Sequence, residues 1–169
     1  MTAVSPEFSR RVQLARLGAH EAIYPIRAEA AEREALARRF DLLSLDRLEA
    51  EIRLQRLAGG MVRLNGRLAA DAVQACVVSL EPVASVLEQD FTVLYGPTEP
   101  GKSVMVNLET DEAEVFDGDA IDIGEAVTQQ LALALDPYPR APGSALPAEA
   151  RATPADSPFG VLAALKTGQ

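Results

Sequence analysis

The sequence contains no tryptophan, one histidine and one cysteine among its 169 residues, and aromatic residues make up only 5% of it. A single cysteine excludes a disulfide within the chain and a zinc site built from several thiolates. No apolar run approaches the roughly 20 residues that a membrane-spanning helix needs. Because 48% of the residues are hydrophobic, the chain can still fold around one aliphatic core. We therefore expect a folded, cytoplasmic protein without a membrane segment.

Catalytic patterns are also lacking. The chain has no Gly-rich phosphate loop, no nucleophile elbow and no His-rich metal pattern, and His20 falls in a predicted loop without a neighbouring ligand. Cys76 could act as a nucleophile, but it continues the inward parity of residues 62–70, which favours a buried structural thiol. The prediction is a protein without catalytic residues, metal, cofactor or small-molecule substrate. An enzyme that depends on Cys76 is the alternative.

Apolar and polar residues alternate over three stretches, 48–55, 62–70 and 87–95, and Gly59-Gly60 separates the first two. Alternation with a period of two predicts strands of a sheet with one buried and one solvated face. A further strand is predicted over 7–17, with Phe8, Val12 and Leu14 on one side and its edge paired elsewhere in the sheet.

Two stretches have helical patterns. Residues 27–40 are rich in Ala, Glu, Arg and Leu, with Ala31, Ala35 and Leu36 on the predicted buried side. A second helix is predicted to begin at Asp122, whose side chain would cap it, and to end before Asp136-Pro137.

These elements predict an α+β fold. We expect a curved antiparallel sheet of four to six strands with two packed helices, and closure of the sheet into a barrel is left open. The predicted domain spans 1–136. A Pro-rich linker follows over 137–157, and residues 158–169 form a short apolar segment that docks back on the domain or is recognised by a partner.

The charges are unevenly distributed along the chain. Residues 1–75 carry 12 basic residues, all arginine, against 10 acidic ones, whereas residues 76–169 carry 4 basic and 15 acidic residues. Arg53, Arg63 and Arg67 share the solvated parity of their strands and are candidates for binding phosphate. Residues 109–125 hold eight acids and no base, and they could bind a basic partner through Glu109, Asp111, Glu112 and Glu114. The spacing of Asp117, Asp119 and Asp122 does not match a calcium loop.

Several segments together are similar to one protein family. They are Val62-Arg63-Leu64-Asn65-Gly66, the run from Gln74 through Cys76, Leu80, Glu81 and Pro82 to Val83, Ile121-Asp122-Ile123-Gly124, the run from Gln130 through Asp136 and Pro137 to Pro139, and Ser157-Pro158-Phe159-Gly160-Val161-Leu162. In this order they resemble the YceD family, the large ribosomal RNA subunit accumulation proteins.

The resemblance implies a non-enzymatic bacterial factor in accumulation or processing of large-subunit ribosomal RNA. Its partner would be that RNA or its precursor, contacted through the arginines, or a basic ribosomal protein or processing ribonuclease held by the acidic run. Many members of the family carry a Cys-x-x-Cys pair where this chain has Cys76 and Ser79. One thiolate cannot close a structural zinc site, so no metal is expected here.

Overall fold

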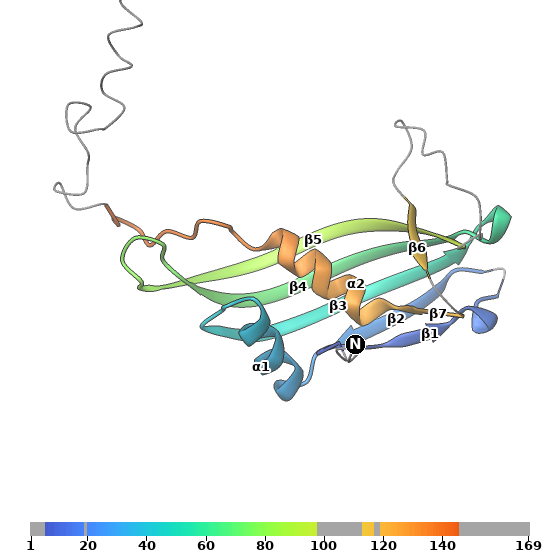
Figure 1. Ribbon diagram of the computed structural model, residues 1–169, viewed down its shortest axis with the longest axis horizontal. Coiled ribbons are helices and arrows are strands. Elements are labelled where there is room, and N and C mark those ends of the chain that lie inside the picture. The colour runs from blue at the N-terminus through green and yellow to red at the C-terminus, as the bar shows by residue number, and fades with distance from the viewer. Residues whose placement is uncertain (1–5, 19, 98–112, 117–118, 146–169) are drawn as a thin grey trace, which may run out of the picture.

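A computed structural model describes residues 6–18, 20–97, 113–116 and 119–145. Its main feature is a five-stranded sheet in the order β2 (Ala22–Arg27), β3 (Ser44–Arg56), β4 (Val62–Ala75), β5 (Pro82–Pro97) and β6 (Ala113–Phe116). The first four strands are antiparallel, and β6 joins β5 in parallel. In the described part of the chain β2 does not pair with β6, so the sheet is open and does not close into a barrel. Figure 1 shows the long β4–β5 hairpin extending to one end of the molecule.

The helices and a small second sheet cover one face of this sheet (Figure 1). Helix α1 (Ala30–Arg39) packs mainly on β3, and helix α2 (Ile123–Ala134) contacts β1, β4 and β5. The small sheet pairs β1 (Arg11–Gln13) with β7 (Ala120–Asp122). Two short 3-10 turns, η1 (Leu14–Arg16) and η2 (Ala58–Gly60), connect strands. The predicted α+β class is therefore confirmed, as a two-layer arrangement.

The alternation in the sequence produces the single core. The inward residues of β3 and β4 are almost fully buried; they include Leu48, Ile52, Leu54, Val62, Leu64 and Leu68. Phe8 and, from the helices, Leu36, Val127 and Leu131 complete this core from the other layer. The opposite side of each strand carries polar and charged residues, because side chains alternate across a strand. That side is called the outer face below, and no helix of the described residues covers it.

The second helix is capped as predicted. The Asp122 carboxylate accepts hydrogen bonds from the backbone N–H groups of Gly124 (3.1 Å) and Glu125 (3.2 Å). It also accepts the Arg10 backbone N–H at 2.8 Å, so the same side chain joins the N-terminal segment to α2. Because the first N–H groups of a helix have no partner within it, this cap sets where α2 begins.

Some predictions were wrong in detail. Only Arg11–Gln13 of the stretch 7–17 forms a strand, and it pairs with β7 rather than with the main sheet. Strand β2 was missed because Pro25 lies within it; Pro is tolerated there because β2 is an edge strand of the described sheet. Ala31 of α1 is exposed, and the buried side of that helix is centred on Leu36. Within the described residues, no helix is long and apolar enough to cross a membrane.

Candidate nucleic-acid interface

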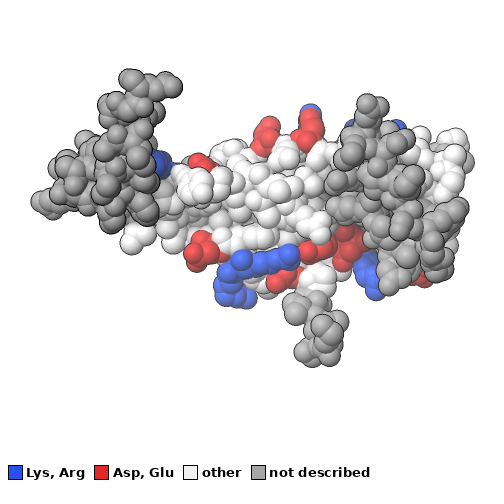
Figure 2. All heavy atoms as spheres, turned by 45° about the horizontal axis from the view of Figure 1, so that its top comes forward, with Lys and Arg blue, Asp and Glu red and all other residues white. Residues whose placement is uncertain are grey.

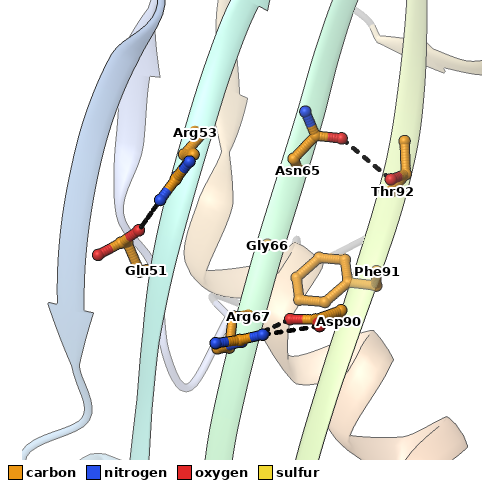
Figure 3. A pocket seen from close by; sticks show the side chains of 8 residues that line it. All are labelled: Glu51, Arg53, Asn65, Gly66, Arg67, Asp90, Phe91 and Thr92. Carbon is orange, nitrogen blue, oxygen red and sulfur yellow. Dashed lines mark hydrogen bonds and ion pairs between the residues drawn. The ribbon is translucent and has the colours of Figure 1, made fainter.

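The three arginines predicted to bind phosphate lie close together on the outer face. Arg53 of β3 is opposite Asn65 of β4, and Arg63 and Arg67 are the next outward residues of β4 on either side of Asn65. A hollow of about 490 Å³ opens here across β3, β4 and β5 (Figure 3). Its lining consists of Glu51, Arg53, Asn65, Gly66, Arg67, Asp90, Phe91 and Thr92.

Two of these arginines are held by carboxylates. Arg67 donates two hydrogen bonds to Asp90 on β5, from Nε at 2.7 Å and from Nη2 at 3.0 Å. Arg53 binds Glu51, two residues earlier on the same strand, at 2.8 Å (Figure 3). The Arg67 and Asp90 side chains are 74% and 68% exposed, so solvent screens their attraction. Exposed pairs of this kind contribute little to stability, because water and salt screen the attraction and two long side chains must be held in one geometry.

Hydrogen bonds favour the charged forms of three of these side chains. The hydrogen bond from Arg67 holds the pKa of Asp90 below its usual value, and the bond to Asp90 raises the pKa of Arg67. The bond to Glu51 likewise raises the pKa of Arg53. Arg53, Arg67 and Asp90 are therefore held more firmly in their charged forms than the free side chains are.

Arg63 differs from the other two. Its cross-strand neighbours are Gln55 of β3 and Leu94 of β5, and among the described residues no carboxylate forms an ion pair with it. Among the described outward residues of β2 to β5 the charges balance, with five arginines (Arg27, Arg47, Arg53, Arg63 and Arg67) and five acids (Glu49, Glu51, Asp71, Glu88 and Asp90). This face is neutral in a protein whose formal charge is −9.

Other polar groups of the hollow were not found from the sequence. Thr92 donates a hydrogen bond to the side-chain oxygen of Asn65 at 3.0 Å, directly beside the Arg53–Glu51 pair. On the core side of the strand the Phe91 ring covers Gly66, where a side chain would otherwise lie. Both contacts depend on the β4–β5 register, which the alternation of single strands does not reveal.

A second group of the residues singled out in the sequence forms a tight turn at the end of the β4–β5 hairpin. Residues 76–81, called the Cys76 turn below, are closed by hydrogen bonds from the Cys76 N–H to the Glu81 carbonyl (2.8 Å) and from the Leu80 N–H to the Cys76 carbonyl (3.0 Å). Leu80 has a φ of +63°, which is rare for a residue with a side chain.

The stretch after α2 is bound to this turn. Val77 donates its N–H to the Pro139 carbonyl at 2.9 Å, and the Gln74 side chain donates to the Asp136 carbonyl at 2.9 Å. Asp136 and Pro137, distant in sequence from Gln74 and Cys76, are thus brought beside them. The Cys76 turn and residues 136–141 form one local unit.

The Cys76 thiol is buried, as its parity predicted. Hydrogen bonds from the Ala141 backbone, from the Ser79 side chain and backbone and from the Val78 backbone lower the pKa of this thiol to about 6, and they outweigh the opposing effect of burial. The Val78 and Ser79 N–H groups lie 3.4 Å from the sulfur. Since the side chain has no contact with solvent, a substrate has no access to the sulfur in this conformation.

The acidic candidates fall mostly outside the described residues. Glu109, Asp111 and Glu112 lie outside them, and so does Asp117 of the weak metal pattern. Glu114 belongs to β6, opposite Tyr95 of β5 in the parallel pairing. Among the residues that the structure describes, no cluster of three His, Cys, Asp or Glu side chains could hold a metal ion.

Comparison with known proteins adds an independent observation. The family model described as large ribosomal RNA subunit accumulation protein YceD matches residues 64–166, more than half of the chain. The chain belongs to the YceD family. Neither the curated proteins nor the solved structures contain a match.

Membership links this chain to accumulation of large-subunit ribosomal RNA, the process for which the family is named. The matched region includes β4 from Leu64 onward, β5, the Cys76 turn and α2. Of the three candidate arginines, Arg67 falls within the YceD match, whereas Arg53 and Arg63 precede it.

Proposed function

We propose that the protein is a non-enzymatic factor in accumulation and processing of large-subunit ribosomal RNA, and that it binds this RNA or its precursor through Arg53, Arg63 and Arg67. It acts in the bacterial cytoplasm, where ribosomes assemble. The observation that carries the proposal is that Arg53 and Arg67 line one open hollow on an exposed sheet face, and that Arg63 is the next outward residue of β4 beyond Asn65. A guanidinium fork matches the geometry of a phosphate, and its charge is permanent.

The ion pairs on this face are compatible with RNA binding. Because an exposed ion pair contributes little to stability, a phosphate can replace Asp90 at Arg67 or Glu51 at Arg53 at little cost. Arg63 requires no such exchange, since no described carboxylate is paired with it. The balanced charge of the face also limits the number of phosphates bound. Three contacts to a single strand predict a slope of about −2 for log K against log salt concentration.

The test is binding of transcribed segments of large-subunit ribosomal RNA, measured by fluorescence anisotropy over a range of salt concentrations. Arg63→Glu and Arg67→Glu should each weaken binding by about tenfold or more, which corresponds to 1.4 kcal/mol or more. Arg38→Glu, an exposed residue of α1 outside this face, is the matched control and should have a much smaller effect.

A second variant separates RNA binding from a purely structural role of the arginines. Asp90→Asn removes the carboxylate that competes with phosphate for Arg67, so it should tighten RNA binding while leaving the fold intact. Equal RNA affinity for wild type, Arg63→Glu and Arg67→Glu would refute the proposed interface. Crosslinking in native cells, followed by sequencing of the attached RNA, identifies the RNA segment bound.

The alternative is an acidic module that holds a basic ribosomal protein or a processing ribonuclease through Glu109, Asp111, Glu112 and Glu114. The excess of acids in residues 76–169, together with the neutral outer face, favours this second candidate. Neutralising Glu112 and Glu114 should then abolish capture of the partner, whereas Arg63→Glu should not. A Cys76-dependent enzyme is disfavoured by the burial of the thiol, and loss of function in a folded Cys76→Ser variant would revive it.

A further inference from the structure

Exposed apolar side chains gather at the hairpin end of the molecule. Leu80 in the Cys76 turn is 76% exposed, and Tyr138, in the stretch that binds this turn, is 72% exposed. Val77, which is 48% exposed, belongs to the same hydrogen-bonded unit, since its N–H binds the Pro139 carbonyl. Exposed apolar side chains that gather in one region are typical of a binding site.

A groove continues from these residues toward α2. It has a volume of about 380 Å³ and is lined mainly by apolar residues, among them Phe40, Ala75, Val77, Ala132, Leu135 and Pro137. Leu133, next to Ala132 on α2, is 74% exposed. We call the groove together with Val77, Leu80, Leu133 and Tyr138 the hairpin-end surface.

The hairpin-end surface continues an uncharged region of the molecule. After Glu125, α2 carries no charged residue, and β5 carries none from Pro82 to Leu87. In Figure 2 the charged residues lie along the upper and lower margins of the molecule and leave an uncharged band between them. Two carboxylates, those of Asp41 and Asp136, lie in the groove lining itself. In a chain with a net charge of −9, such a region fits an occupant that is itself apolar and nearly uncharged.

The chain itself supplies a segment of this kind. Ala141 lies against the Cys76 sulfur, and the described structure ends only four residues later, at Ala145. The 24 residues that follow contain one apolar run, Phe159-Gly160-Val161-Leu162-Ala163-Ala164-Leu165, followed by Lys166. The match to the YceD family includes this run, because it continues to residue 166, and it includes the hairpin-end surface except for Phe40 and Asp41.

We propose that residues 158–166 dock on the hairpin-end surface of the same chain. The connection from residue 145 to residue 158 is long enough, since 13 residues can span up to about 45 Å. Because the segment and the surface belong to one chain, their effective concentration is high and even a weak apolar contact is well populated. Docking would cover the groove and the exposed side chains of Val77 and Leu80.

Disulfide trapping in the full-length protein tests this contact. The variant Leu80→Cys/Leu162→Cys should form an intramolecular disulfide under mild oxidation at a rate independent of protein concentration. The matched control is Ile23→Cys/Leu162→Cys, because Ile23 is also an exposed apolar residue but lies on β2, near the opposite end of the sheet. The Leu80 pair should react at least tenfold faster than the control. Equal rates would overturn the proposal, and so would a disulfide that forms only between chains at a rate rising with concentration.

Hydrogen exchange supplies a second readout that requires no new bond. Leu162→Glu places a charge in the docking segment, and it should speed amide exchange in residues 76–81 and 133–141 at least threefold. Ala150→Glu adds the same charge in the connection and should leave those rates unchanged. Identical exchange in wild type and Leu162→Glu would refute docking. Neither experiment involves RNA, so the outcome is independent of the proposed RNA interface.

Discussion

Substitution of Gly66 by alanine tests how the sheet is packed. A methyl group at Gly66 would lie 2.5 and 2.8 Å from Cε1 and Cε2 of the Phe91 ring, and closer still to Cζ. Carbon atoms in contact are normally about 3.5–4.0 Å apart, so the ring would have to move by roughly 1 Å. Phe91 is only 9% exposed, so most of its surface is already in contact with other atoms of the protein.

Two opposing effects determine how much Gly66→Ala changes the free energy of unfolding. Overpacking of a well-packed core costs about 1–3 kcal/mol. Replacing a strand glycine by alanine would otherwise stabilise the protein by about 0.4–1 kcal/mol, because the unfolded chain loses freedom. We therefore expect Gly66→Ala to lower the free energy of unfolding by about 1–2 kcal/mol. The melting temperature should fall by roughly 3–8 °C.

A double-mutant cycle, measured by urea unfolding, isolates the contact. In a Phe91→Leu background the smaller side chain makes room for the methyl group, and Gly66→Ala should become neutral or stabilising. Gly18→Ala is the control, since a methyl group there meets no atom within 4 Å. The same cost in both backgrounds, or no cost in the wild type, would refute the packing argument.

Three further predictions concern single side chains. Asp122→Ala should lower the free energy of unfolding by about 2–3 kcal/mol, because it removes the α2 cap and the link to Arg10. Asp122→Asn keeps the Oδ1 acceptor, so it should lower this free energy by less in the same urea measurement. The hydrogen bond from Arg10 lowers the pKa of Glu32 below its usual 4.5. Ionised Glu32 therefore stabilises the folded protein above pH 4.5, and this stabilisation is lost as the pH falls through the lower pKa of the folded state. The difference in unfolding free energy between wild type and Glu32→Gln should accordingly shrink below pH 4.5, and a constant difference would contradict this. For Cys76, the ultraviolet absorbance of the thiolate should appear at a pH of about 6 in the folded protein and near 9.0 in the unfolded protein. A transition near 9.0 in both states would show that the hydrogen bonds to the sulfur do not stabilise the thiolate.

The accuracy of the sequence-based predictions depended on how local each feature is. The outward position of Arg53, Arg63 and Arg67 follows from the period of two, which is a property of each strand alone. Cys76 is buried as its parity predicts, but it lies beyond the end of β4 and residues 139–141 contact its turn. The cap at Asp122 lies within three residues of the N–H groups it binds. Strand β2 escaped detection because Pro25 interrupts an otherwise suitable pattern, and a proline is acceptable only where the strand is at an edge.

The sequence by itself therefore determined the fold class, the polar face and the presence of a single aliphatic core. The tertiary structure determined which charged side chains form ion pairs. Arg67 faces Asp90 because the Cys76 turn closes the hairpin with Ala75 opposite Pro82, and every other pair of β4 and β5 follows from that register. Tertiary packing likewise brings Pro139 and Ala141 to the Cys76 turn. Such contacts join residues far apart in the chain, and no short-range periodicity specifies them.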